Sequence, residues 1–221
     1  AMAALAAAIM DLEKQIYPSL TAEDQIKKCS FLARLGSGSA ARSVEGPLVL
    51  WGEHAATPVS SDLFGVRWTK AADVFKTYRD TILLVDKGQK EVSSTIGHDL
   101  MHNHPFAETR FAQAKAHYQA LLTILEKGDM DGFSDLVERE ALSLHAMMLT
   151  SSPSYILMHP NTIQIIKQVR TFRKTSGLHL TFTLDAGANV HLLYPAHEAE
   201  KIDQFIASDL RKYCQDNELI Y

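Results

Sequence analysis

The chain has 221 residues, of which 46% are hydrophobic and 22% are charged. These proportions are typical of packed globular proteins, and they exclude a disordered chain because such chains carry too few apolar residues to build a core. The net charge of −4 argues against a nucleic-acid or anionic-membrane surface built from bulk charge, although a local basic site can still hold a phosphate. The two cysteines, Cys29 and Cys214, are too few for a disulfide framework and lack metal-ligand spacing. We therefore expect a cytoplasmic protein with one large domain or two small ones.

The first ten residues, AMAALAAAIM, predict a helix that starts at the beginning of the chain. Neither Ser, Thr, Asp nor Asn precedes this run as a cap, so it resembles part of a longer helix. The run is too short to span a bilayer and lacks the basic leader of a secretory signal. We expect a buried amphipathic helix whose preceding segment is missing from this chain.

The rest of the chain mixes helical and strand-like patterns. Thr21 and Asp24 resemble a capping box that opens a helix ending near Leu35. Apolar residues at helical spacing predict four later helices, and short apolar or alternating runs predict five strands. The helices are expected at about 105–127, 130–150, 161–174 and 196–213, and the strands at 47–51, 64–68, 81–86, 178–184 and 190–194. Helices grouped between strands without strict alternation indicate an α+β fold.

A run of small residues, SGSAARS at 37–43, interrupts the helical pattern and is a candidate anion site. Gly38 lets backbone N–H groups approach an anion, Ser37 and Ser39 offer hydroxyl donors, and Arg42 offers a planar fork for phosphate or carboxylate. Glycine and serine are also the commonest residues of flexible surface loops, so that alternative stays open. The Gly-Lys-Ser/Thr ending of a P-loop is absent.

A second candidate is Asp185, which ends an apolar strand and begins the sequence DAGAN before the next strand. Such an aspartate could be a general base or a charge anchor, and it could equally be the first residue of a turn, which loop statistics favour.

Other polar groups have simpler interpretations. Ser93 and Ser94 precede an expected helix, where hydroxyls cap a helix or contact phosphate, and capping is the safer interpretation. His98, His102 and His104 have no carboxylate or cysteine spaced to complete a metal shell, so we expect a polar loop and assign no metal ligand. Glu53-His54 is interpreted as a strand end, and Cys29 as core filling.

Three separated motifs together strongly resemble the diphosphomevalonate decarboxylase family of the GHMP kinase superfamily. They are ARLGSGSAARS at 33–43, VSST at 92–95 and TLDAGANV at 183–190, and they occur in the family's order with its long helical stretch between the second and third. The sequence SLHA at 143–146 also resembles the family's pattern, and the resemblance covers essentially the whole chain.

The resemblance implies an enzyme that uses ATP and Mg²⁺ to convert (R)-5-diphosphomevalonate to isopentenyl diphosphate, ADP, phosphate and CO₂. Residues matching the family's first motif, Ser37, Gly38 and Ser39, are then expected to hold the substrate diphosphate, and Arg42 to hold the substrate near its carboxylate. A homodimer is also expected, because it is common in the family.

The later motifs receive roles from the same resemblance. Asp185 is expected to lie at the tertiary 3-hydroxyl of the substrate, as the base or the electrostatic anchor for phosphorylation of that hydroxyl. Ser93 and Ser94 are expected to lie near the ATP phosphates and the substrate. Ala41 and Ala188 stand where the family often has Cys and Pro, and both changes are small.

The family's architecture implies two domains with the active site between them. Residues 1–78 are expected to be the remnant of an N-terminal domain like the second domain of ribosomal protein S5, and residues 79–221 a ferredoxin-like C-terminal domain. The family's substrate-binding lysine and its ATP-phosphate loop are absent, and we expect them before residue 1. Two alternatives stay open: a superfamily kinase that phosphorylates the 3-hydroxyl without decarboxylation, and a non-catalytic fragment lacking the ATP loop.

Overall fold

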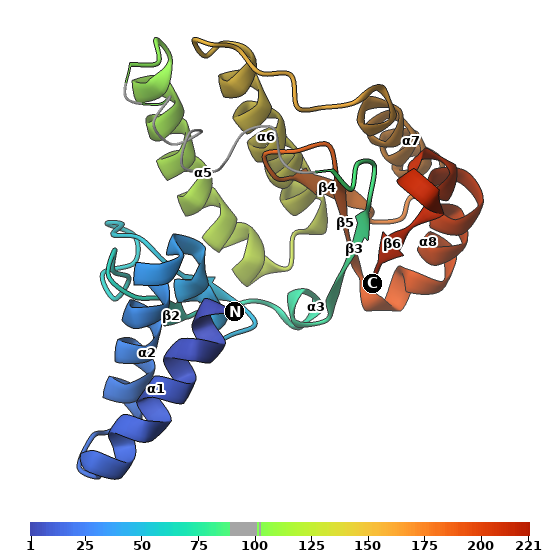
Figure 1. The fold of residues 1–221 in the computed structure, drawn as a ribbon. Helices are drawn as coiled ribbons and strands as arrows, with labels where there is room; N and C mark the ends of the chain where they lie inside the picture. Colours follow the sequence, from blue (N-terminus) through green and yellow to red (C-terminus); the bar gives the residue numbers. More distant parts are fainter. Residues whose placement is uncertain (89–100, 102) are drawn as a thin grey trace. The chain divides into compact units, whose positions relative to one another are not determined.

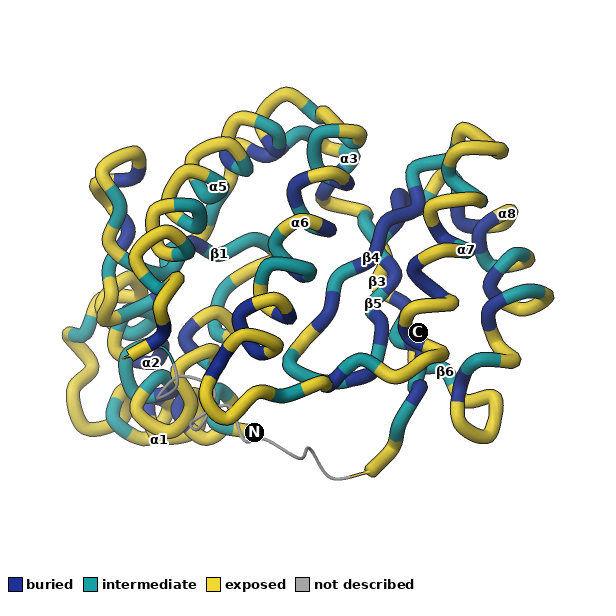
Figure 2. Tube along the Cα trace, turned by 90° about the horizontal axis from the view of Figure 1, so that it is seen from above, coloured by how far each residue is buried: buried dark blue, intermediate teal, exposed yellow. Residues whose placement is uncertain are grey.

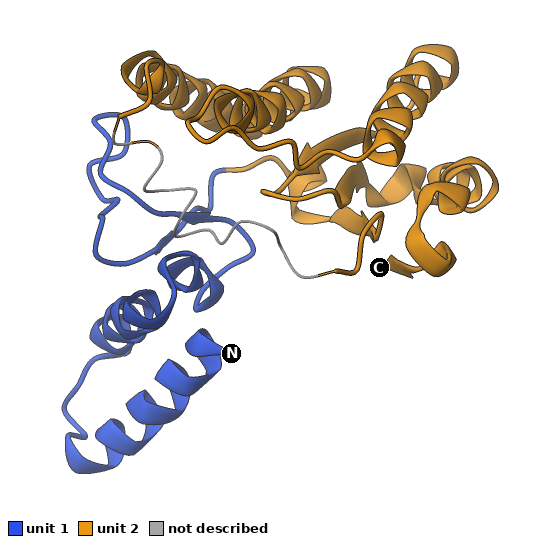
Figure 3. Cartoon of the chain, turned by 45° about the horizontal axis from the view of Figure 1, so that its top comes forward, with its two compact units in different colours: residues 1–70 blue, residues 71–221 orange. Residues whose placement is uncertain are grey.

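The computed structural model describes residues 1–88, 101 and 103–221 and contains two compact units. Unit 1 comprises residues 1–70 and unit 2 residues 71–221 (Figures 1 and 3). Ser93, Ser94, His98 and His102 lie outside the described residues. The domain boundary predicted at residue 78 stays a prediction.

Unit 1 begins with two helices that pack against each other, α1 (Met2–Ile16) and α2 (Ala22–Gly36) (Figure 1). The Thr21 side chain accepts a hydrogen bond from the backbone N–H of Asp24 at 3.1 Å, which confirms the predicted N-terminal cap of α2. Buried side chains of both helices form a small core, which confirms Cys29 as core filling; they are Ala6, Met10, Cys29 and Ala33.

The helix α1 is amphipathic but only partly buried. The side that faces α2 is covered, whereas the large apolar side chains of Leu5, Ile9, Leu12 and Ile16 are 55%, 46%, 62% and 70% exposed. The predicted helix at the start of the chain is therefore confirmed, and within unit 1 its burial is limited to the side that α2 covers.

The remainder of unit 1 is a six-residue 3₁₀ helix, η1 (Gly38–Ser43), and a two-stranded antiparallel sheet. Its strands are β1 (Val49–Leu50) and β2 (Val66–Arg67). Both lie within the predicted strands but are shorter. Gly52, just after β1, has φ of +108°, a backbone conformation that ends extended structure and favours glycine.

Unit 2 is built on a four-stranded antiparallel sheet with the strand order β4-β5-β3-β6. The strands are β3 (Tyr78–Leu83), β4 (Thr181–Leu184), β5 (Val190–Pro195) and β6 (Leu219–Ile220). Three of them overlap predicted strands, although β3 begins three residues before the predicted strand at 81–86. The fourth, β6, is not among the predicted strands, because two residues are too few to show a period.

The helices of unit 2 pack against this sheet or against one another (Figure 1). They are α3 (Asp73–Lys76), α5 (Ala107–Lys127), α6 (Met130–Leu149), α7 (Pro160–Ser176) and α8 (Ala199–Phe205). Short helical turns surround and extend α8: η2 (Ala196–Glu198), the π-helical η3 (Ile206–Leu210), η4 (Arg211–Tyr213) and η5 (Gln215–Asn217). The single helix predicted at 196–213 is thus a succession of α, π and 3₁₀ segments.

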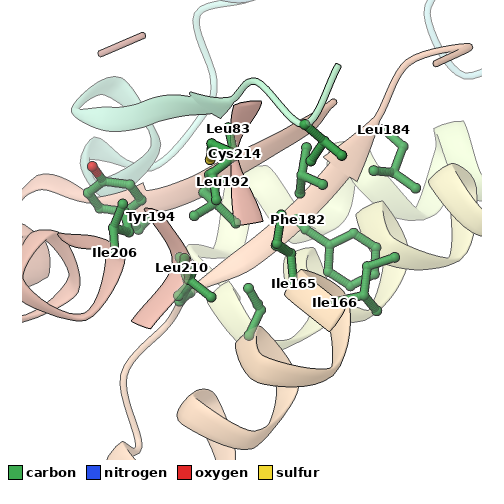
Figure 4. Close-up of a cluster of buried hydrophobic side chains, with 14 of the residues drawn as sticks. Leu83, Ile165, Ile166, Phe182, Leu184, Leu192, Tyr194, Ile206, Leu210 and Cys214 are labelled. Carbon is green, nitrogen blue, oxygen red and sulfur yellow. The ribbon is translucent and has the colours of Figure 1, made fainter. Parts of the chain in front are cut away.

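The main core lies between the sheet and the helices of unit 2, where buried residues gather on the strands and on the inward sides of α7 and α8 (Figure 2). Phe182, Leu192 and Tyr194 from the strands are completely buried, as are Ile165 of α7 and Ile206 of η3 (Figure 4). A sheet with such a core and helices grouped between its strands is the α+β fold that the sequence predicts.

Candidate functional site

One candidate segment lies in unit 1, at the turn from α2 into η1. Ser37 ends α2 in an extended conformation, with φ of −162° and ψ of 119°, and its carbonyl accepts a hydrogen bond from the Ala40 N–H at 2.9 Å. Gly38, Ser39 and Arg42 follow within η1. The structure therefore places the four residues predicted to bind the substrate anion in one short turn.

Side chains of this turn are exposed, and those of Ser37, Ser39 and Arg42 make no hydrogen bond or ion pair with the residues that the structure describes. A Cβ on Gly38 would lie 3.2 Å from the Trp51 ring, so a side chain there would press on the indole. Glycine at this position keeps the turn close to Trp51 while its backbone stays accessible.

Ser30 of α2 holds η1 in place. This residue is not among the candidates predicted from the sequence. Ser30 is 1% exposed, and its hydroxyl donates to the carbonyl of Ala41 at 2.7 Å and accepts from the N–H of Gly65 at 2.8 Å. Because Ala41 lies between Ser39 and Arg42, the bond fixes the backbone from which both side chains project. Burial of Ala41, which is 1% exposed, explains why a small residue suits this position.

A separate candidate segment lies in unit 2: the loop 185–189, which connects β4 to β5 between the paired residues Leu184 and Val190. Asp185 is its first residue, and the Gly187 N–H donates to the Asp185 carbonyl at 2.8 Å. The Asp185 side chain is exposed and accepts no hydrogen bond from the described part of the chain. The turn and the free carboxylate are thus present together, so the two interpretations of this motif are compatible.

Hydrogen bonds from three other segments hold this loop, two through its backbone carbonyls and one through the Asn189 side chain. His145 of α6 lies with its Nε2 3.1 Å from the Asp185 carbonyl, and Thr162 of α7 donates to the Ala188 carbonyl at 2.6 Å. The Asn189 side chain accepts from the N–H of Asp86 at 2.9 Å. A mobile hairpin tip would lack such anchors, so Asp185 is presented from a rigid support.

An ion-pair network centred on the buried Glu138 joins α6 and α7. Glu138 of α6 is 3% exposed and accepts from Arg170 at 2.9 Å, from Arg173 at 2.6 Å and from the Thr181 hydroxyl at 3.2 Å. Arg173 also donates to the Leu180 carbonyl at 2.7 Å. A carboxylate buried with these partners is fully bonded, so its role is to tie both helices to β4.

The remaining polar candidates have structural roles in the described residues. His104 lies with its Nε2 3.0 Å from the Met147 carbonyl, and the Nδ1 of His54 accepts from the Ala56 N–H at 3.1 Å in a turn that is not a strand end. Within the described ranges, no three His, Cys, Asp or Glu side chains are grouped to hold a metal ion. Among the described helices, none combines the length and the hydropathy needed to cross a membrane.

Family models match both units. The mevalonate 5-diphosphate decarboxylase C-terminal domain matches residues 81–220, well over half of the chain. The chain belongs to the mevalonate 5-diphosphate decarboxylase family. A second model, the diphosphomevalonate decarboxylase-like N-terminal domain, matches residues 1–62. The resemblance carried by the three motifs is thereby confirmed.

Known relatives carry the same family name. The diphosphomevalonate decarboxylase of Saccharomyces cerevisiae is 30% identical over 207 residues, covering 92% of this chain and 50% of the yeast protein. The chain spans about half the length of the curated relatives it matches.

Solved structures share the fold. The mevalonate diphosphate decarboxylase of Legionella pneumophila superposes with a TM-score of 0.80 and 25% identity, over 99% of this chain and 64% of that one. A structure described as "MDDEF in complex with MVAPP, AMPPCP and Magnesium" superposes with a TM-score of 0.75 and 24% identity, over 91% of this chain and 58% of that one. The α+β, GHMP-kinase-like fold predicted from the sequence is confirmed.

Proposed function

We propose that this chain takes part in the ATP-dependent decarboxylation of (R)-5-diphosphomevalonate to isopentenyl diphosphate, with release of ADP, phosphate and CO₂. The observation that carries the proposal is Asp185, whose carboxylate is exposed on a loop that His145, Thr162 and Asp86 hold rigidly. This loop lies inside the segment that matches the family's C-terminal domain. An ionised carboxylate on a fixed support suits acid–base or electrostatic work on a hydroxyl.

The anionic groups of the substrate fit the turn of unit 1. Ser37, Gly38 and Ser39 offer two hydroxyls and accessible backbone groups for the diphosphate, and all three are exposed. Arg42 offers five N–H donors in a planar fork that matches a carboxylate, and it stays charged at every physiological pH. Because Arg42 cannot act as an acid, it would hold the substrate near its carboxylate without protonating it.

The chemistry consists of phosphoryl transfer followed by fragmentation. The tertiary 3-hydroxyl oxygen attacks the terminal phosphorus of ATP, the bond to ADP breaks, and the hydroxyl proton leaves. Next, the carbon–oxygen bond breaks and phosphate departs with the electron pair. The bond to the carboxylate carbon then breaks, its electrons form the new double bond, and CO₂ is released.

Asp185 has two possible roles in this sequence. It could accept the hydroxyl proton during the transfer, or its negative charge could stabilise the positive charge that develops on carbon as phosphate leaves. Both roles need the Asp185 carboxylate close to the tertiary carbon of the substrate.

ATP and Mg²⁺ are part of this proposal through the family. The solved structure of a protein with this fold in complex with MVAPP, AMPPCP and magnesium supports binding of an ATP analogue and Mg²⁺. The described residues offer no cluster of three acidic or histidine side chains for a metal. In phosphoryl-transfer sites Mg²⁺ usually keeps several of its waters and is bound by the substrate phosphates together with only one or two protein carboxylates. A cluster of three protein ligands is therefore not required. Ser93 and Ser94 are proposed near the ATP phosphates.

We also propose a cytoplasmic homodimer. Both cysteines, Cys29 and Cys214, are free and buried, which suits a reducing compartment. The dimer rests on the family resemblance, and light scattering on the purified protein tests it.

A product assay tests the proposed function. The full-length protein is incubated with MgATP and diphosphomevalonate labelled at its carboxyl carbon, with 5-phosphomevalonate as the matched substrate lacking one phosphate. We expect labelled CO₂, ADP and isopentenyl diphosphate in equal amounts from the diphosphate. ADP and a phosphorylated acid without CO₂ would instead identify a kinase.

A further inference from the structure

His145 connects helix α6 to the residue on which the proposed chemistry depends. Its side chain is 2% exposed, and its Nε2 lies 3.1 Å from the carbonyl oxygen of Asp185. A carbonyl oxygen accepts hydrogen bonds and cannot donate them, so Nε2 carries the proton and donates. The neutral ring therefore has its proton on Nε2 and a free lone pair on Nδ1. Burial lowers the pKa of His145, against the raising effect of the Asp185 carbonyl.

The contact acts at the Asp185 end of the loop. The bonds from Thr162 and Asp86 reach Ala188 and Asn189, at the other end. At the Asp185 end, the same carbonyl accepts from His145 and from the Gly187 N–H, at 3.1 and 2.8 Å. The two donors together fix the direction of the Asp185 carbonyl, and with it the peptide plane from which the Asp185 side chain leaves.

Packing supports the same geometry. Ala186, the residue after Asp185, packs against the buried side chains of Met148 and Leu157. Met148 lies on α6, three residues after His145, so the histidine and the methionine face the loop from neighbouring positions of one helix face. The helix α6 therefore contacts the first two loop residues by one hydrogen bond and one apolar contact.

We propose that His145 is a positioning residue that sets the orientation of Asp185 for the reaction. This inference rests on the proposed function, in which Asp185 acts at the tertiary hydroxyl. Because the His145 side chain is buried and bonds the Asp185 carbonyl, it acts through the backbone of Asp185. Small displacements of a reacting group lower the rate of the chemical step more than they lower substrate binding.

The test compares two variants at this position with a matched control. His145→Leu fills the volume but removes the donor, whereas His145→Gln places an amide N–H at the same ε position. His179→Leu is the control, because His179 lies before β4, at the end of the strand opposite Asp185, and pairs with Glu198 at 2.7 Å. Activity of the full-length protein is measured with MgATP and diphosphomevalonate.

In His145→Leu we expect kcat to fall about tenfold or more, with KM for diphosphomevalonate within about twofold of the wild type. His145→Gln should recover most of the loss, and His179→Leu should keep the wild-type kcat. Equal losses of kcat in both leucine variants, or no recovery with glutamine, would show a purely structural role and overturn the proposal.

A second readout separates this inference from the proposed function. Hydrogen exchange of the Gly187 amide reports the order of the loop without any substrate. We expect faster exchange in His145→Leu alone, and unchanged exchange there overturns the positioning role. If the wild type releases no CO₂ from diphosphomevalonate, the proposed function fails, and the exchange result still decides whether His145 orients the loop.

Discussion

The Thr162 hydroxyl donates a hydrogen bond to the carbonyl of Ala188 at 2.6 Å, and it accepts one from the His159 N–H at 3.2 Å. Thr162 is completely buried in the first turn of α7. One hydroxyl thus caps a helix and anchors the loop that begins at Asp185, so the position of that loop depends on where α7 begins.

Replacing Thr162 with valine keeps its shape and removes both bonds. The buried carbonyl of Ala188 loses its donor, so we expect the free energy of unfolding of unit 2 to fall by about 1–3 kcal/mol. Urea unfolding followed by circular dichroism measures the change. Thr175→Val serves as the control, because Thr175 is exposed near the other end of the same helix, and its effect should stay within about 0.5 kcal/mol. Equal effects at both positions would contradict the anchoring role.

In unit 1, a substitution of Ser30 tests whether its hydroxyl holds η1 in place. Ser30→Ala removes the bonds to the Ala41 carbonyl and the Gly65 N–H, and we expect unit 1 to lose about 1–3 kcal/mol of stability. Both tryptophans of the chain, Trp51 and Trp68, lie in unit 1, so tryptophan fluorescence during urea unfolding reports this unit. The exposed Ser43→Ala is the matched control and should leave the midpoint unchanged. A wild-type midpoint for Ser30→Ala would refute the account of how η1 is held.

Removal of the Glu138 carboxylate should destabilise unit 2 strongly. In Glu138→Ala, Arg170 and Arg173 lose their carboxylate partner, although Arg173 keeps the Leu180 carbonyl, and the buried Thr181 hydroxyl loses a partner. We expect the free energy of unfolding to fall by about 3 kcal/mol. This is the lower end of the usual cost of breaking a buried ion pair, because the Arg170 side chain is half exposed. Glu126→Ala, at an exposed position on α5, provides the comparison and should change the stability by about 0.5 kcal/mol or less. A cost for Glu138→Ala as small as that of the control would show that the network does not join the helices.

Acidification should weaken unit 2 through His145. Burial lowers the pKa of His145 in the folded state, so between the ordinary histidine pKa of about 6.5 and that lower value the unfolded chain binds more protons. Stability therefore rises with pH in this range and falls as the pH drops below about 6.5. Urea unfolding of the wild type and His145→Gln at pH 7 and pH 5 isolates the contribution, because glutamine does not titrate. Parallel losses in both proteins would exclude His145 as the source.

The sequence was most informative where local chemistry determines structure. The cap at Thr21 and the strands on either side of the loop 185–189 were predictable, because capping and alternation are properties of a few adjacent residues. The same holds for the turn at Ser37, whose small residues indicated a break in the helix.

The supports of the candidate site could not be predicted in the same way. Ser30, His145 and Thr162 are polar residues within helices, and their partners lie far away in sequence. One signal was available for His145: it shares a helix face with Ala141 and Met148, both buried, and a histidine on an apolar face needs a partner. Identifying that partner as the Asp185 carbonyl requires the tertiary structure.

The carboxylate of Asp185 is the group on which the proposed reaction most directly depends, and a single substitution tests its role. Asp185→Asn keeps the size of the side chain and removes the charge and the basic oxygen. In the full-length protein with MgATP and diphosphomevalonate, we expect the rate of CO₂ release to fall by about 100-fold or more. Thermal unfolding should be nearly unchanged, because the side chain is exposed and makes no bond in the described part of the chain. A variant that releases CO₂ at the wild-type rate would contradict the proposed role of Asp185.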